Sequence, residues 1–188
     1  KAGESTRAVH GGERDQRESD SLTTPIHQTS TFWFENTEQL RAYTEGRLIR
    51  DEYGRYSNPT WRAVQGKICE LEGAEEAVLF ASGMCAATTT FLAMVPRGGH
   101  IIVTSDCYRR TRQFIQQYLS KLDVEATIID PADPIQLKDA IRDDTCLFFT
   151  ESPTNPYLRV TDLPEAARIA HERGVTVMVD STFASPVN

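Results

Sequence analysis

Short apolar runs alternate with amphipathic segments along the chain from residue 77 to residue 180. Each apolar run is continuous and bounded by turn residues, so buried strands are expected at 77–80, 100–104, 124–129, 146–150 and 175–179. The segments between them predict helices at 83–95, 109–119, 134–142 and 162–173. Continuous apolar strands separated by helices are typical of a parallel sheet covered on both faces. The predicted fold class is therefore α/β, with a parallel sheet and three layers.

Capping residues sharpen the predicted helix boundaries. Asn58 can cap a helix that has Pro59 in its first turn, and Gly73 is placed to end it. Asp162 can cap the last helix, with Glu165 three residues later as in a capping box. These residues predict one further helix, from about residue 59 to residue 72, ahead of the alternating region.

The first 58 residues lack this regularity. Lys1 to Asp20 is charged and has no apolar period, so it is predicted to be extended, and one short helix is expected at 37–43. Phe32, Trp33 and Phe34 are adjacent aromatic residues without a predicted regular element to cover them. Because exposed apolar surface usually marks an interface, we expect a symmetric partner to cover them. The predicted organisation is an N-terminal arm, 1–58, that contacts a partner subunit, followed by a large domain, 59–188.

Composition narrows the possible functions. The chain has 188 residues and a formal net charge of −7, which does not favour a nucleic-acid or anionic membrane surface as partner. No apolar run approaches the roughly 18–20 residues that a membrane-spanning helix needs, and the polar N-terminus has no secretory signal pattern. The four cysteines are widely spaced, without a metal-binding pattern, so buried reduced thiols and no metal site are expected.

Polar residues follow several of the predicted strands. In parallel sheets, ligands bind beyond the carboxyl ends of the strands, so Ser82-Gly83, Tyr108, Asn155 and Asp180 are expected at one edge. The Ser82-Gly83 turn opens a helix, and a helix N-terminus suits an anion. Each of these residues alone also fits an ordinary turn or helix cap.

Together, these groups match an aromatic ligand that has a phosphate and a basic ring nitrogen. Asp180 would hold the ring nitrogen protonated, Tyr108 would stack on the ring, and Asn155 would donate to a ring oxygen. Pyridoxal 5′-phosphate (PLP) has this structure, and its function as an electron sink depends on the protonated ring. Tyr53 and Arg55, in the arm, form a further pair suited to a phosphate, although a surface turn is the other interpretation.

Several strings of the sequence resemble one enzyme family. They are TTPIHQTSTF (23–32), EYGRYSNPT (52–60), ASGMCA (81–86), DCYRRTR (106–112), FFTESPTNPYLR (148–159) and VDSTFASP (179–186). The chain resembles the Cys/Met-metabolism branch of the PLP-dependent enzymes with the aspartate-aminotransferase fold (fold type I). Within this branch, cystathionine γ-synthases of plants and algae are the most similar.

The resemblance implies a set of site residues. Cofactor-binding positions would be Tyr53, Arg55, Ser82, Gly83, Met84, Tyr108, Asn155, Asp180 and Thr182. Gly83 and Met84 match the backbone cradle of the phosphate, and Thr182 matches a small hydroxyl residue close to the cofactor. Tyr53 and Arg55 match a pair that reaches the neighbouring subunit's phosphate. The residues implied in catalysis are Tyr108, Asp180 and Tyr53.

The chain departs from the family pattern in two respects. The family's Schiff-base lysine follows the strand that ends at Asp180, whereas the lysines here are Lys1, Lys67, Lys121 and Lys138. The C-terminal small domain, with its arginine for the substrate carboxylate, also has no counterpart. We therefore expect an N-terminal portion of a longer enzyme, inactive by itself.

The implied reaction of the whole enzyme is γ-replacement on amino-acid substrates, in which an O-activated homoserine and cysteine give cystathionine for methionine biosynthesis. Cystathionine γ- or β-lyase, methionine γ-lyase and O-acylhomoserine sulfhydrylase are the alternatives within the family. A non-catalytic fragment, or a nucleotide-binding domain without the usual G-x-G-x-x-G string, would be of another class. The resemblance also implies a homodimer with shared active sites that pairs into a tetramer, in the cytoplasm or the chloroplast stroma.

Overall fold

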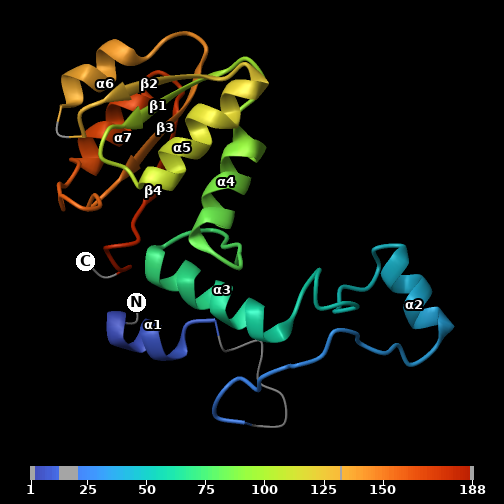
Figure 1. Ribbon diagram of the computed structural model, residues 1–188. Coiled ribbons are helices and arrows are strands. Elements are labelled where there is room, and N and C mark those ends of the chain that lie inside the picture. Colours follow the sequence, from blue (N-terminus) through green and yellow to red (C-terminus); the bar gives the residue numbers. More distant parts are fainter. Residues whose placement is uncertain (1–2, 13–20, 132, 187–188) are drawn as a thin grey trace. The chain divides into compact units, whose positions relative to one another are not determined.

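The computed structural model describes residues 3–12, 21–131 and 133–186 (Figure 1). The chain forms two compact units, one up to Leu79 and one from Phe80 to Pro186. The two units are described separately below. The predicted division into an arm, 1–58, and a domain, 59–188, stays a prediction.

The second unit is built on a sheet of four strands in the order β2-β1-β3-β4. The strands are β1 (His100–Thr104), β2 (Glu125–Ile129), β3 (Thr145–Glu151) and β4 (Thr176–Asp180). All neighbouring pairs are parallel; Val103 is opposite Phe149, and Phe149 is opposite Met178. The parallel sheet predicted from the apolar runs is confirmed.

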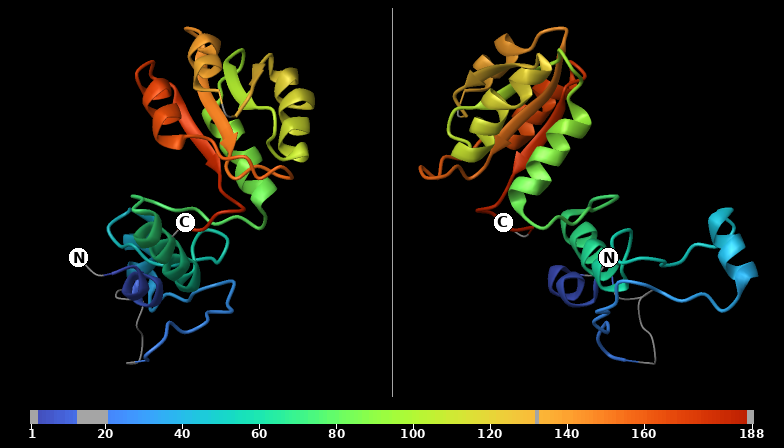
Figure 2. Two further views of the ribbon diagram at one scale, coloured as in Figure 1. Left: turned by 90° about the vertical axis from the view of Figure 1, so that its left-hand side faces the viewer. Right: turned by 45° about the vertical axis from the view of Figure 1, so that its right-hand side comes forward.

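Helices cover both faces of this sheet (Figure 2). They are α4 (Gly83–Met94), α5 (Arg109–Gln117), α6 (Pro134–Ala140) and α7 (Leu163–His171). Phe91 of α4 and Ile115 of α5 are buried with Phe149 in one core, whereas Leu137 of α6 and Ile169 of α7 are buried with Phe148 in another. Phe148 and Phe149 are consecutive in β3 and therefore point to opposite faces. The result is the predicted three-layer arrangement.

The predicted caps occur in the structure. Ser82 Oγ accepts a hydrogen bond from the Cys85 N–H at 3.1 Å, and Asp162 Oδ1 accepts one from Glu165 N–H at 3.1 Å. In the first unit, Asn58 caps α3 (Pro59–Glu72), and Gly73 ends it with a φ of 67°. Other ends differ: α6 and α7 are shorter than predicted, and a 3-10 turn, η1 (Leu119–Leu122), follows α5.

The strand predicted at 77–80 is wrong. This segment has no regular secondary structure, and Val78 is 70% exposed. A strand forms only where a neighbour accepts and donates its backbone hydrogen bonds. Within the described residues, no strand pairs with this segment, and an apolar composition alone does not replace such a partner.

The first unit contains a helix where an extended arm was predicted. Within the predicted arm segment 1–20, the described residues include α1 (Glu4–His10), while residues 1–2 and 13–20 lie outside the described part. This helix packs against α3, and Arg7 Nη1 donates to Glu70 O at 2.7 Å. Gly12 and Gly66 allow the approach, because a Cβ on Gly66 would lie 2.9 Å from Gly12 Cα.

The remaining arm folds around a second helix, α2 (Thr37–Thr44), at the position predicted. Asn36 caps it through the Gln39 N–H, at 2.9 Å. Phe34 packs on Tyr43 with ring centroids 5.4 Å apart, and the Arg50 guanidinium lies 4.5 Å from the Phe34 ring centroid. The expectation that the aromatic residues have no element to fold against is therefore wrong for Phe34, whereas Trp33 remains 75% exposed.

The described helices, potential metal ligands and cysteines can be compared with the sequence predictions. Among the described residues, no helix has the length and apolarity needed to cross a bilayer. Nor does the described part of the chain bring three or more potential metal ligands together. All four cysteines are free thiols, as expected. The expected burial holds for Cys107 but is wrong for Cys85, which is exposed at the start of α4, and Cys69 and Cys146 are half-buried.

Candidate functional site

The start of α4 presents unpaired backbone amides. Ser82 Oγ binds the Cys85 N–H, so within the described residues the N–H groups of Gly83 and Met84 have no protein acceptor. A Cβ built on Gly83 would meet nothing within 4 Å, so the space in front of this turn is open. Thr111 Oγ1 donates to Met84 Sδ at 3.6 Å and thereby ties the turn to α5. The predicted anion turn therefore has the geometry that a phosphate needs.

Tyr108 lies at the start of α5, just beyond the carboxyl end of β1. Its side chain is exposed, with 40% of the residue surface accessible, so a face of the phenol ring is open to a ligand. The backbone N–H of Tyr108 donates to Glu151 Oε2 at 2.5 Å. Tyr108 is thus fixed through its main chain while its ring stays free to stack.

Asp180 ends β4 and is the register partner of Glu151 at the end of β3. Its Oδ1 accepts hydrogen bonds from Thr182 N at 3.1 Å and from Thr182 Oγ1 at 2.6 Å. Within the described residues Oδ2 has no protein donor. Thr182 therefore orients Asp180, and one carboxylate oxygen remains for a protonated ring nitrogen.

Asn155 follows β3 in a loop with two cis X-Pro bonds, Ser152-Pro153 and Asn155-Pro156. Its side-chain amide makes no hydrogen bond within the described residues, and it is partly buried. The Arg159 N–H donates to Thr154 Oγ1 at 3.0 Å, which closes the loop on itself. A free amide on a fixed loop can donate to a ligand oxygen.

Two groups at this edge were not identified from the sequence. Arg159 forms ion pairs with Asp106, at 3.2 Å, and with Asp130, so one guanidinium ties the segments that follow β1, β2 and β3. Glu151 is 3% exposed, and burial, together with the nearby Asp180 charge, raises the pKa of its carboxyl. The only sequence signal for Glu151 is its place at a strand end, and the partners of Arg159 lie far apart in the chain.

Cys107, between Asp106 and Tyr108, is buried and unreactive. Burial raises the pKa of its thiol to about 12. Because the thiolate is the nucleophile of cysteine chemistry, Cys107 is expected to be a packing residue at this edge.

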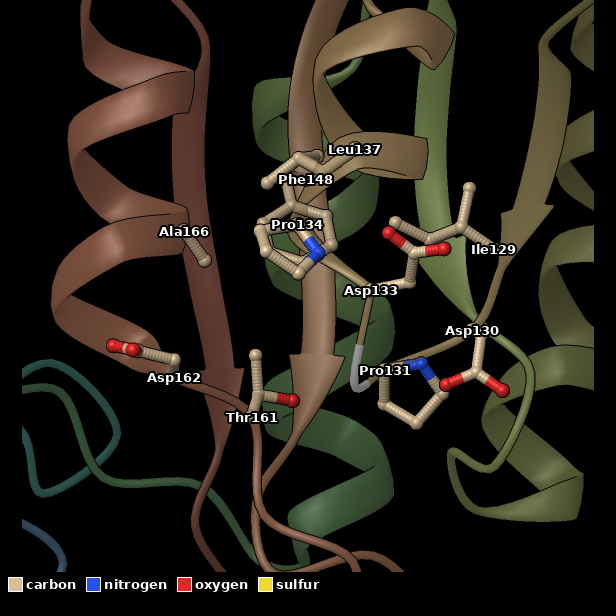
Figure 3. A pocket seen from close by; sticks show the side chains of 10 residues that line it. All are labelled: Ile129, Asp130, Pro131, Asp133, Pro134, Leu137, Phe148, Thr161, Asp162 and Ala166. Atoms are coloured by element: carbon tan, nitrogen blue, oxygen red, sulfur yellow. The ribbon is translucent and has the colours of Figure 1, made fainter.

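One pocket near the strand ends is small. A cavity of about 30 Å³ lies between the starts of α6 and α7, and Asp130, Pro134, Phe148, Thr161 and Ala166 are among the residues that line it (Figure 3). This is room for about one water molecule. An aromatic cofactor would therefore bind on the open edge next to Tyr108 and Asp180, not in this cavity.

Tyr53 and Arg55 lie in the first unit, where they form a cluster with Tyr56. The Arg55 guanidinium lies 4.5 Å from the Tyr53 ring centroid and 5.1 Å from that of Tyr56. The backbone is held by the Gly54 N–H, which donates to Ser30 O at 2.8 Å. The pair is therefore ordered within its own unit, and its contact with a phosphate stays a prediction.

The lysines of the second unit do not lie at the carboxyl edge. Lys121 is in η1 and Lys138 is in the last turn of α6, and both segments lead back to the amino ends of strands. Lys67 lies in α3 of the first unit and donates to Val9 O at 3.2 Å, while Lys1 is outside the described residues. In the described part of the chain, the carboxyl edge therefore holds the groups predicted to bind the ring and the phosphate, but no amine for a Schiff base.

The residues present fit PLP. Gly83 and Met84 offer amides and open space for the phosphate, and Tyr108 offers an exposed ring. Asn155 and Asp180 offer a free amide and a free carboxylate oxygen. The sequence-predicted residues of the second unit thus come together at one edge, and their individual roles stay predictions.

The chain is similar to known proteins over almost its whole length. Residues 5–188 match the family model described as Cys/Met metabolism PLP-dependent enzyme. Cystathionine gamma-synthase 1 of Arabidopsis thaliana is 49% identical over 96% of this chain and 32% of its own length. Its Nicotiana tabacum counterpart is 50% identical over 96% of this chain and 34% of its own. The chain therefore spans about a third of these relatives.

Solved structures share the fold. The structure of metB from Corynebacterium glutamicum superposes with a TM-score of 0.88 at 34% identity, covering 98% of this chain and 46% of that one. The structure of cystathionine gamma-lyase from Lactobacillus plantarum, complexed with L-serine, superposes with a TM-score of 0.85 at 33% identity. It also covers 98% of this chain and 46% of that one. The α/β unit with its parallel sheet is thus part of the fold type I architecture. The chain belongs to the Cys/Met metabolism family of PLP-dependent enzymes.

Proposed function

We propose that this chain is part of a PLP-dependent enzyme that joins an O-activated homoserine and cysteine to give cystathionine. The observation that carries the proposal is the identity of 49% and 50% to two plant cystathionine gamma-synthases over nearly the whole chain. The Bacillus subtilis cystathionine gamma-lyase is 35% identical over a similar length. Because the chain spans about a third of the plant relatives, the activity is proposed for a longer protein.

Each residue at the carboxyl edge has a defined part in this proposal. Bound PLP would supply an electron sink for chemistry at the amino-acid substrate. Asp180 Oδ2 would keep a proton on the ring nitrogen, and Tyr108 would hold the ring by stacking. Asn155 donates to the ring oxygen, and the Gly83 and Met84 amides bind the phosphate. Tyr53 and Tyr108 are candidates for assisting proton transfer near the substrate.

The first unit is proposed to act across a homodimer. Tyr53 and Arg55 would supply charge-assisted hydrogen bonds to the partner's phosphate, which the backbone amides of Gly83 and Met84 do not provide. Pairing of two dimers into a tetramer is proposed from the family resemblance. For location, we propose the cytoplasm or the chloroplast stroma, since the relative from Arabidopsis thaliana is named chloroplastic.

A lyase or sulfhydrylase reaction is the second candidate. An L-methionine gamma-lyase of Porphyromonas gingivalis is 37% identical and an O-acetyl-L-homoserine sulfhydrylase of Corynebacterium glutamicum is 30% identical, each over nearly all of this chain. These values lie well below those of the plant synthases, so the synthase reaction is preferred.

The test compares the reactions in the full-length protein that carries this chain. With cysteine and O-phospho-, O-succinyl- or O-acetyl-homoserine, cystathionine is expected to form faster than 2-oxobutanoate forms from cystathionine or methionine. Faster release of 2-oxobutanoate would assign a lyase instead, and faster formation of homocysteine from sulfide would assign a sulfhydrylase. If the full-length protein binds no PLP, all of these PLP-dependent reactions are refuted, and a non-catalytic role is favoured.

A further inference from the structure

Glu151 is a buried carboxylate that the proposed reaction does not yet use. It ends β3, in the middle of the carboxyl edge, and only 3% of its surface is exposed. A buried carboxylate needs donors, because its desolvation is otherwise costly. Its donors are backbone amides that belong to the two loops on which the ring-binding residues lie.

The first donor is the N–H of Tyr108, 2.5 Å from Glu151 Oε2. Tyr108 is the N-cap residue of α5, and it makes no side-chain capping bond of its own. Glu151 therefore fixes the start of α5 from a different strand, and with it the point from which the phenol ring projects. A hydrogen bond from an amide N–H to an ionised carboxylate is of the charge-assisted, stronger kind.

The backbone N–H of Asn155 also acts on this carboxylate. It lowers the pKa of the Glu151 carboxyl, against the larger, opposite effect of burial. Asn155 lies in the loop directly after β3, so this interaction connects the loop to the strand end. The neighbouring Ser152 N–H donates to Asp180 O at 3.0 Å, which extends the β3–β4 pairing to the same point. One carboxylate thus links the loops that carry Tyr108 and Asn155, beside Asp180.

We propose that Glu151 is a positioning residue of the cofactor site, which holds the backbones of Tyr108 and Asn155 at a fixed place relative to Asp180. The inference rests on the proposed function, since it concerns the residues that would bind PLP. Glu151 itself does not contact the ring in this role. Its loss leaves all three ring-binding side chains present but lets two of them shift, and sub-ångström shifts are enough to weaken such a site.

The experiment uses the full-length protein and compares Glu151→Gln with the matched control Glu125→Gln. Both substitutions remove one carboxylate from a strand end, but Glu125 is an exposed residue at the amino edge of β2. Affinity for PLP is measured by titration of the apoprotein, and the visible circular dichroism per bound PLP reports how the ring is held. Thermal unfolding of the apoprotein is measured in parallel.

For Glu151→Gln we expect PLP affinity to fall by about tenfold to a hundredfold, as for the loss of charge-assisted hydrogen bonds. The circular dichroism of the PLP that does bind should also change, whereas Glu125→Gln should match wild type in both measurements. If Glu151→Gln lowers only the unfolding temperature and leaves affinity and circular dichroism as in wild type, the positioning role is refuted.

The remaining outcomes are also decisive. If Glu151→Gln does not fold, Glu151→Asp is tested instead. This variant keeps the negative charge, but its side chain is one methylene shorter, so the carboxylate oxygens lie farther from their donors. The same loss of affinity and altered circular dichroism in this variant support the inference, and wild-type values refute it. If the wild-type protein binds no PLP, the proposed function fails and the inference fails with it. If wild type binds PLP normally while both Glu151 variants behave like wild type, the inference alone is wrong.

Discussion

His100 is the most fully enclosed polar side chain at the amino ends of the central strands. Its Nδ1 lies 2.7 Å from Thr145 Oγ1 and its Nε2 lies 2.8 Å from Thr127 Oγ1, so the ring links β3, β1 and β2. Burial lowers the pKa of this imidazole, and the charge of Arg142 lowers it further. Two hydroxyl groups can satisfy a neutral ring, since one accepts and the other donates.

This environment predicts an acid-sensitive fold. Because the folded state disfavours the imidazolium, the unfolded state binds more protons once the pH falls below about 6.5. The contribution of neutral His100 to the free energy of unfolding is therefore complete above that pH. It is lost as the pH falls toward the lowered pKa of His100 in the folded state. Urea unfolding at pH 7.5 and pH 5.5 should show a smaller loss of unfolding free energy for His100→Asn than for wild type. An equal loss in both proteins would contradict this assignment.

Asp180 allows a prediction about chemistry at the same scale. In the full-length protein, Asp180→Asn should keep the fold and still bind PLP, because Asn is nearly the same size. Turnover should fall by orders of magnitude, since the amide does not keep the ring nitrogen protonated. Asp139→Asn, on the exposed surface of α6, is the control and should leave the steady-state rate unchanged. A near-normal rate in Asp180→Asn would mean that another group protonates the ring.

The site residues predicted from the sequence follow from local patterns, whereas the residues that were missed depend on contacts between distant segments. Tyr108, Asn155 and Asp180 lie in the short segments that follow apolar runs, so the rule that strand ends converge was enough to group them. The links made by Glu151 and Arg159 depend on strand order and register, which local patterns do not encode. A carboxylate and a guanidinium in the sequence are compatible with many partners, and only the assembled sheet selects one.

At the scale of elements, helices were predicted well where the apolar pattern and the capping residues indicate the same boundaries. The helix α1 was missed because ESTRAVH has no apolar period and none of its residues is buried. Its contact with α3 depends instead on glycine backbones, which leave almost no trace in a hydrophobic pattern. The wrong strand at 77–80 shows the converse, since an apolar run remained irregular without a neighbouring strand in the described sheet.

The α1–α3 contact predicts the effect of a small substitution. Gly66→Ala would place a methyl group 2.9 Å from Gly12 Cα, closer than such contacts allow. Overpacking of this kind costs about 1–3 kcal/mol, whereas the gain in helix propensity is about 1 kcal/mol. We expect the amides of α1 to exchange hydrogen faster in Gly66→Ala, while those of α3 stay protected. Gln65→Ala, one position earlier in α3, should leave α1 unchanged; if it loosens α1 equally, the glycine contact is not the cause.

At the scale of the whole molecule, the first unit exposes large apolar side chains that its own elements do not cover. The most exposed are Leu22 at 78%, Ile26 at 77%, Trp33 at 75% and Ile49 at 96%. Uncovered apolar surface of this kind is typical of a segment that contacts another chain. It supports the proposal that Arg55 acts on the partner's cofactor in a symmetric dimer.

Mixing two inactive variants tests this arrangement. In the full-length protein, Arg55→Ala and Asp180→Ala should each have little activity. If Arg55 acts across the interface, every mixed dimer regains one complete site, and an equal mixture should recover about a quarter of the wild-type activity. If subunit exchange is demonstrated and the mixture stays inactive, Arg55 serves its own chain.

The ion pairs of Arg159 with Asp106 and Asp130 have a kinetic consequence. One side chain joins the segments that follow three neighbouring strands, so the carboxyl edge is already assembled before any ligand arrives. A preassembled surface loses less conformational entropy when a ligand binds, and no slow rearrangement has to precede the encounter. Ligand capture at this edge should therefore be a single-step process, with an observed rate that rises linearly with ligand concentration and shows no plateau.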